Sequence, residues 1–148
     1  MNHSSLTDGE RDAYHKAGRP ILKGEEMEKH PEHTASFEYP GQHYTVKIGD
    51  AIIVDTTRAI VLKEVSPKGK YPAVLYFPVE DTRKEFLVGT NHHTFCPLKG
   101  EANYYSLVSE GKTFENAVWY YPTPLEYVKE LSGYLSFYPD KVEIAAET

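Results

Sequence analysis

The sequence predicts a mostly β fold, a small antiparallel domain of tent-like or barrel-like shape with one or two short helices. Stretches rich in β-branched and aromatic residues recur roughly every 8–15 residues and are separated by turn-forming residues. One segment near the end of the chain has the apolar spacing of a helix. A length of 148 residues suits a single domain with a sizeable core.

The strands are predicted from side-chain alternation and turn residues. The segment 43–48 alternates apolar and polar side chains, and residues 49–50 (Gly-Asp) predict a turn. The stretch 51–65 is β-branched but polar in its middle, which favours two strands joined by a bend. Residues 109–115 have the composition of a hairpin loop, with Gly111 in its tight position. The predicted strands cover residues 43–48, 51–55, 59–65, 73–78, 103–108, 116–121 and 133–138, and residues 80–88 are expected to form a helical turn and a short strand.

The predicted helix lies in "PTPLEYVKEL", residues 122–131. Its apolar side chains follow a helical spacing, Pro124 occupies an N-terminal position, and Gly133 lies just past the end. We expect this helix to be the main one in the domain.

Residues 1–36 form a polar arm in this interpretation, and residues 37–148 form the single domain. The arm contains four of the seven histidines, and Thr7 and Glu10 have capping-box spacing for a short helix over residues 8–17. The arm is either loosely attached or folded over the domain or a neighbouring subunit. The second alternative allows a homodimer.

The overall charge argues against several classes of partner. The formal net charge is −6 and no run of Lys or Arg stands out, so no nucleic-acid partner is expected. No apolar stretch approaches the length of a membrane span, and no signal peptide is visible, so no membrane partner is expected. One cysteine excludes an intramolecular disulfide and suits a reducing compartment, which predicts a cytoplasmic protein.

A series of motifs between residues 46 and 142 resembles the family called domain of unknown function 427. The pair "YFP" and "CPLKG", in this order, is the most specific part of the resemblance. It implies a β-tent fold similar to that of methionine sulfoxide reductase B, and the family carries a nucleotidyltransferase label. The motifs are "GDAIIVDT" (49–56), "YFP" (76–78), "CPLKG" (96–100), "AVWYYP" (117–122) and "FYPD" (137–140).

Neither nucleotidyl transfer nor metal binding is favoured by the residues themselves. No glycine-rich phosphate loop occurs, and Asp50 and Asp55 would point to opposite faces of a strand. His92, His93 and Cys96 lie close together in sequence, but nothing supplies the remaining ligands of a metal site. No organic cofactor motif is visible, so neither a metal nor a cofactor is expected.

Cys96 has two interpretations. Lys99 and a nearby His92 or His93 could activate it as a nucleophile, since thiolates and not thiols react. Alternatively, Cys96 is a small buried residue that packs at the end of a strand, as free cysteines commonly do.

Glu64 is the second candidate catalytic residue. Alternation places it on the same strand face as Ile60 and Leu62, so its carboxylate needs a partner, for which Arg58, Lys99 or a tyrosine hydroxyl is available. Glu64 is then either a general acid or base or half of a buried ion pair. Arg58 and Lys99 are also candidate contacts for an anionic ligand group, although Arg58 could equally be a surface residue of its strand.

The aromatic side chains of the predicted strands either pack in the core or line a ligand pocket. In the second case the predicted site is a pocket with Tyr76, Tyr105 and Trp119 as walls and Glu64 and Cys96 as floor. It would bind a small organic molecule and carry out acid–base or thiol chemistry on it. The competing prediction is a binding or interaction module without chemistry, which associates with itself through an aromatic face or the arm.

Overall fold

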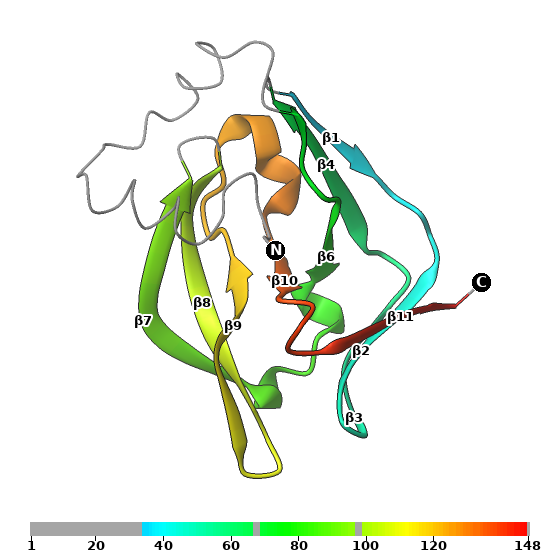
Figure 1. Cartoon of the computed structure of the whole chain (residues 1–148), viewed down its shortest axis with the longest axis vertical. Coiled ribbons are helices and arrows are strands. Elements are labelled where there is room, and N and C mark those ends of the chain that lie inside the picture. The colour runs from blue at the N-terminus through cyan, green and yellow to red at the C-terminus, as the bar shows by residue number, and fades with distance from the viewer. Residues whose placement is uncertain (1–33, 67–68, 97–98, 148) are drawn as a thin grey trace.

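A computed structural model describes residues 34–66, 69–96 and 99–147, which form two antiparallel sheets and three short 3₁₀ helices (Figure 1). The strands are β1 (Thr34–Glu38), β2 (His43–Ile48), β3 (Ala51–Thr56), β4 (Ile60–Ser66), β5 (Gly69–Lys70), β6 (Val74–Pro78), β7 (Leu87–Cys96), β8 (Gly100–Ser109), β9 (Lys112–Tyr120), β10 (Tyr134–Phe137) and β11 (Glu143–Glu147). The helices are η1 (Val79–Asp81), η2 (Lys84–Phe86) and η3 (Glu126–Leu131).

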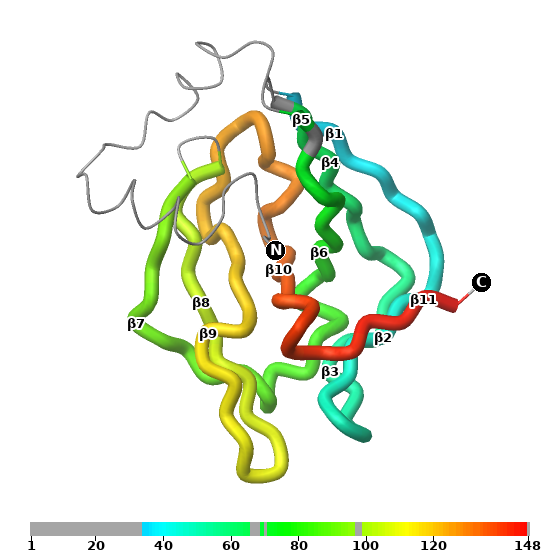
Figure 2. The backbone as a smooth tube through the Cα atoms, in the orientation of Figure 1, coloured from blue at the N-terminus to red at the C-terminus, as the bar shows by residue number. Residues whose placement is uncertain are grey.

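The larger sheet has eight strands in the order β1-β4-β6-β10-β9-β8-β7, with β5 paired to β4. The smaller sheet has the order β11-β2-β3. The path of the backbone shows the larger sheet curving round between its edge strands β1 and β7 (Figure 2). The predicted mostly β, antiparallel class is therefore confirmed, in the form of open sheets and not of a closed barrel. Within the described ranges, no helix is both long and apolar enough to span a membrane.

The hairpin between β8 and β9 follows from its turn residues. Ser109 pairs with Lys112, so the loop consists of Glu110 and Gly111, with φ of 51° and 75°. Positive φ at both positions is the signature of a type I′ turn, which matches the right-handed twist of the strands. The prediction of a hairpin with Gly111 in the tight position is confirmed, although the loop is shorter than expected.

The predicted α-helix over residues 122–131 is instead the 3₁₀ helix η3, Glu126–Leu131, with a non-helical break at Val128 (φ −130°, ψ 32°). Its two buried side chains, Val128 and Leu131, are three residues apart, and a 3₁₀ turn places residues at this spacing on one side. The prolines before it also disfavour an earlier helical start.

Three strands were not predicted, β1, β5 and β11, and most of β7 was also missed, since the short strand expected within residues 80–88 is the start of a strand that continues to Cys96. β11 lies in a segment whose residues are mostly exposed, and it forms because its backbone pairs with β2. Backbone pairing at a sheet edge leaves little trace in side-chain alternation. β1 begins three residues before the expected domain start at Phe37. The helix expected over residues 8–17 lies outside the described residues.

Two hydrophobic clusters lie on opposite faces of the larger sheet, because neighbouring residues such as Tyr76 and Phe77 belong to different clusters. The first packs between the two sheets and includes Val46, Val54 and Val118. The second is called the aromatic face below and is covered in part by η3. Its buried members are Ile60, Leu62, Tyr76, Ala102, Tyr104, Trp119, Tyr121, Val128 and Leu131.

Candidate functional site

A buried ion pair joins Glu64 and Lys99. The Lys99 Nζ atom lies 2.6 Å from Glu64 Oε1, and the two side chains are only 1% and 4% exposed respectively. Ile60 and Leu62 are buried on the same strand, β4, so the predicted inward face is confirmed. Lys99, one of the three kinds of partner considered from the sequence, therefore forms an ion pair with Glu64.

Backbone contacts hold Lys99 in place beyond the end of β7. Its N–H donates to the Cys96 carbonyl at 3.1 Å, and its own carbonyl accepts from the Leu125 N–H at 3.0 Å. The next residue, Gly100, has a φ of 109° and packs so closely that a Cβ would lie 3.3 Å from the Thr123 carbonyl oxygen. This conformation and this closeness both favour glycine after the lysine.

Tyr76 and Trp119, expected as two walls of a pocket, lie together on the aromatic face, where both side chains are fully buried. Their rings meet edge to face with centroids 6.2 Å apart, and Trp119 Nε1 donates a long hydrogen bond of 3.4 Å to Tyr76 Oη. The centroid of the Tyr138 ring lies 5.0 Å from that of Trp119, so Tyr138 extends this group of aromatic rings. The ion pair at the end of β4 therefore shares a sheet face with a continuous group of aromatic rings.

Tyr105 lies on the other face of β8, away from Tyr76 and Trp119. Its ring stacks on that of Tyr120 at 4.9 Å, and it packs against the first cluster. Burial, together with a hydrogen bond to Tyr120, raises the pKa of the Tyr105 hydroxyl. Tyr104 pairs with Trp119 across the strands and takes the place on the aromatic face that the sequence interpretation gave to Tyr105.

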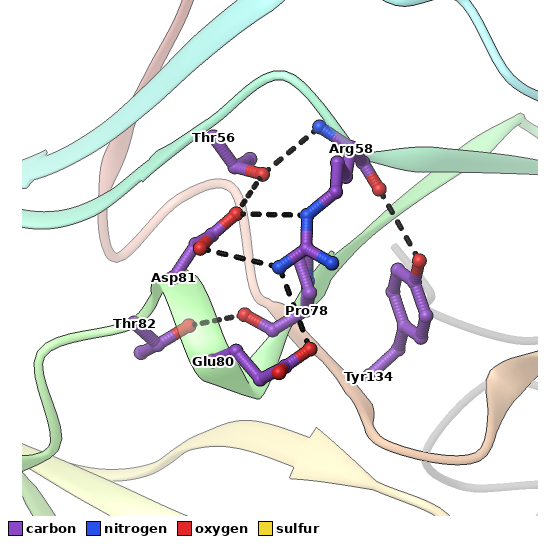
Figure 3. A network of polar contacts seen from close by, with 7 residues as sticks. All are labelled: Thr56, Arg58, Pro78, Glu80, Asp81, Thr82 and Tyr134. Atoms are coloured by element: carbon purple, nitrogen blue, oxygen red, sulfur yellow. Dashed lines mark hydrogen bonds and ion pairs between the residues drawn. The ribbon is translucent and has the colours of Figure 1, made fainter.

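Arg58 is also placed away from Glu64, in a separate surface network (Figure 3). The guanidinium is 53% exposed, with Nη2 3.3 Å from Asp81 Oδ1 and 3.4 Å from Glu80 Oε1. The Thr56 hydroxyl donates to Asp81 Oδ2 at 2.7 Å, and this bond is the largest cause of the lowered pKa of Asp81. These contacts connect the end of β3 to η1, so Arg58 contributes to the connection between the two sheets.

Cys96 is the last residue of β7 and has no exposed surface. The structure therefore brings Cys96 and Lys99 together at one turn and buries both. Thiol chemistry on a ligand would require a local opening of this turn.

A family model for Domain of unknown function (DUF427) matches residues 37–148, which is most of the chain and includes every strand from β2 to β11. The chain belongs to the DUF427 family. No curated protein matches it. The match agrees with the sequence resemblance but assigns no role to any residue.

The two neighbouring histidines of this DUF427 domain point to separate partners. His93 Nδ1 lies 2.8 Å from Asn103 Oδ1 and 3.4 Å from Glu101 Oε2, whereas the His92 ring packs 4.5 Å from the ring of Tyr104. In the part of the chain that the structure describes, no group of three or more His, Cys, Asp or Glu side chains is arranged to hold a metal ion.

Tyr104 and Tyr138 both line a surface hollow of about 260 Å³. A second, larger hollow of about 470 Å³ lies between the β2–β3 and β8–β9 turns, and Lys141 borders both. The site predicted from the sequence did not include Tyr104, Tyr121 or Tyr138, which the structure places on or against the aromatic face. A signal was present in the alternation of Tyr104 and Tyr105, but it does not say which of the two faces the ion pair.

Proposed function

We propose that this DUF427 protein binds a small organic molecule on the aromatic face, next to the Glu64–Lys99 pair. The observation that carries the proposal is the burial of both charges, at 2.6 Å, on a face otherwise built of aromatic and aliphatic side chains. Desolvating two such ions costs several kcal/mol each, and apolar residues of similar volume often serve stability equally well. Charged pairs kept in such places are frequent at functional sites.

The chemistry available to such a site is proton transfer. The Glu64 carboxylate can accept a proton from a ligand, and the Lys99 ammonium can stabilise the negative charge that develops. The rings of Tyr76 and Trp119 have no exposed surface, so their faces would receive a flat or apolar ligand body only in an opened conformation. Cys96 remains a candidate nucleophile at the same turn.

The proposed site does not include Arg58 or Tyr105, since the first belongs to the network at Asp81 and the second packs against the other core cluster. Because Glu64 and Lys99 are almost fully buried, a ligand reaches them only through a local opening of the fold. Binding would then select an opened conformation, and its apparent affinity would be reduced by the rarity of that conformation.

A ligand screen by thermal shift tests the proposal, followed by calorimetric titration of each hit. The informative variant is Glu64→Leu/Lys99→Met, which removes both charges while retaining apolar volume. The matched control is Lys63→Met, because Lys63 is the neighbour of Glu64 on β4 and forms an exposed 2.9 Å ion pair with Glu38. Hits that bind the wild type and the control but not the double variant support the site. Hits that bind all three equally place the ligand elsewhere and refute it.

A second candidate function is that of a non-catalytic interaction module that forms a homodimer. It is favoured by the exposed edge of the larger sheet, where β7 is ten residues long and Val88 is half-exposed. Such an edge can pair with the same edge of a second copy. Sedimentation equilibrium of the wild type and of Val88→Lys tests this: a dimer that the substitution dissociates supports it, and a monomeric wild type excludes it.

A further inference from the structure

One segment of the fold, residues 122–132, is held in place by few contacts. It includes η3 and lies at one end of the curved larger sheet (Figure 1). Within the described ranges, its only backbone hydrogen bond to the rest of the fold runs from the Leu125 N–H to the Lys99 carbonyl, at 3.0 Å. The ion pair between Lys129 and Glu126, at 3.3 Å, stays inside η3. A segment with so few bonds to its surroundings can open while the sheet stays folded.

Two apolar side chains anchor this segment on the aromatic face. Val128 and Leu131 are 2% and 0% exposed respectively. Both belong to the cluster that contains Leu62, which shares a face of β4 with Glu64. The backbone of η3 is broken at Val128, and short 3₁₀ helices have poor internal hydrogen-bond geometry. The burial of these two side chains therefore contributes most of what keeps the segment closed.

The two ends of the segment differ in how firmly they are attached. Pro122 and Pro124 have no N–H group, so neither can donate a backbone hydrogen bond to a neighbouring element. At the other end, Gly133 has a left-handed φ of 79°, and its carbonyl accepts from the Val79 N–H at 2.9 Å. The segment is thus fixed at Gly133 and weakly held before η3, so Gly133 can serve as its hinge.

The same segment packs on the backbone next to the buried ion pair. A Cβ at Gly100 would lie 3.3 Å from the Thr123 carbonyl oxygen and 3.8 Å from Leu125 Cγ. Together with the hydrogen bond to Lys99, these contacts place the segment directly against the turn that carries one of the two buried charges. Displacing it would uncover this turn and the adjoining part of the aromatic face.

We propose that residues 122–132 form a lid that opens about Gly133 and gives a ligand access to the Glu64–Lys99 pair. The lid rests on the function proposed above for its ligand, whereas its opening is a property of the fold that can be measured without one. In the closed state, Val128 and Leu131 occupy space that the ligand would take after opening. A ligand that selects the open state must therefore offset the loss of their burial.

Acetylation of Lys99 measures the opening, because a side chain that is 1% exposed reacts only when it is uncovered. The whole 148-residue chain is treated with sulfosuccinimidyl acetate, and mass spectrometry gives the rate at Lys99 relative to the exposed Lys63. Leu131→Ala removes an anchor of the lid, and Leu107→Ala, the matched control, removes a fully buried side chain of the first cluster. The relative rate at Lys99 should rise about 30-fold or more in Leu131→Ala and much less in Leu107→Ala.

A second variant leaves both anchors in place. Leu125 has a φ of −64°, which proline also adopts, so Leu125→Pro removes the N–H that binds the Lys99 carbonyl without straining the backbone. It should raise the relative rate at Lys99 severalfold.

Two results would overturn the lid. Equal increases in Leu131→Ala and Leu107→Ala would mean that Lys99 is uncovered only by global unfolding. No increase in either Leu131→Ala or Leu125→Pro would mean that it is uncovered by another route. The ligand screen described above is read separately: hits that bind at the ion pair retain the proposed function if the lid fails, and a lid that opens retains this inference if no hit is found.

Discussion

Removing the charge of Glu64 should destabilise this protein more than removing any exposed carboxylate. In Glu64→Gln the side chain keeps its size, but the Lys99 ammonium is left almost fully buried without its counter-charge 2.6 Å away. The free-energy cost of removing the Lys99 ammonium from water, which its attraction to Glu64 had offset, then lowers the stability of the folded state. Breaking a buried pair from one side typically costs about 3–5 kcal/mol.

The double variant and the exposed pair give the comparison. Glu64→Leu/Lys99→Met removes both charges together and should remain within ~1 kcal/mol of the wild type or exceed it in stability. Lys63→Met breaks the exposed ion pair with Glu38, which is worth at most about 1 kcal/mol. The expected order of stability is therefore wild type, double variant and Lys63→Met close together, with Glu64→Gln far below.

Urea denaturation followed by tryptophan fluorescence measures this order, because the single Trp119 lies on the aromatic face. At ~4 °C per kcal/mol for a domain of this size, Glu64→Gln should also melt roughly 12–20 °C lower than the wild type. A loss equal to that of Lys63→Met would show that the buried pair has little energetic importance. A double variant as unstable as Glu64→Gln would show that packing, not charge, decides the site.

Three further predictions concern other parts of the fold. Cys96 should react with iodoacetamide only as fast as the protein unfolds, since its thiol has no exposed surface; reaction at the rate of the denatured control would contradict this. The hydrogen bonds that the His43 ring donates to Asp55, and secondly to Glu147, raise the pKa of His43 above 6.5. The stabilisation from these bonds is therefore complete below about pH 6.5 and is lost as the pH rises through the raised pKa. Stability curves from pH 5 to 9 should show that decline in the wild type and not in His43→Gln. Glu110→Asn should stabilise the β8–β9 hairpin by ~0.5–1 kcal/mol, because asparagine tolerates positive φ better than glutamate, whereas Glu110→Gln should change nothing.

Local patterns in the sequence were sufficient for much of this fold. The inward orientation of Glu64 follows from its alternation with Ile60 and Leu62, and the β8–β9 turn follows from Gly111. Both are properties of a few adjacent residues, because strand geometry repeats every two residues and a type I′ turn needs two positive φ angles.

The edge strands and the form of the last helix were not accessible in this way. β11 has little inward-facing apolar character and exists because β2 offers its backbone a partner. η3 has an apolar spacing that suits an α-helix or a 3₁₀ helix equally well, and its buried side chains, Val128 and Leu131, belong to the aromatic-face cluster.

The sequence by itself determined that this is a mostly β domain of the DUF427 family with a carboxylate on the core side of a strand. Only the tertiary structure decided that Lys99 and not Arg58 neutralises Glu64, and that Tyr104 and not Tyr105 shares its face. The physical reason is that alternation assigns a face to each side chain within its own strand. The choice of partner depends on register and curvature between strands far apart in the chain, which side-chain chemistry alone leaves open.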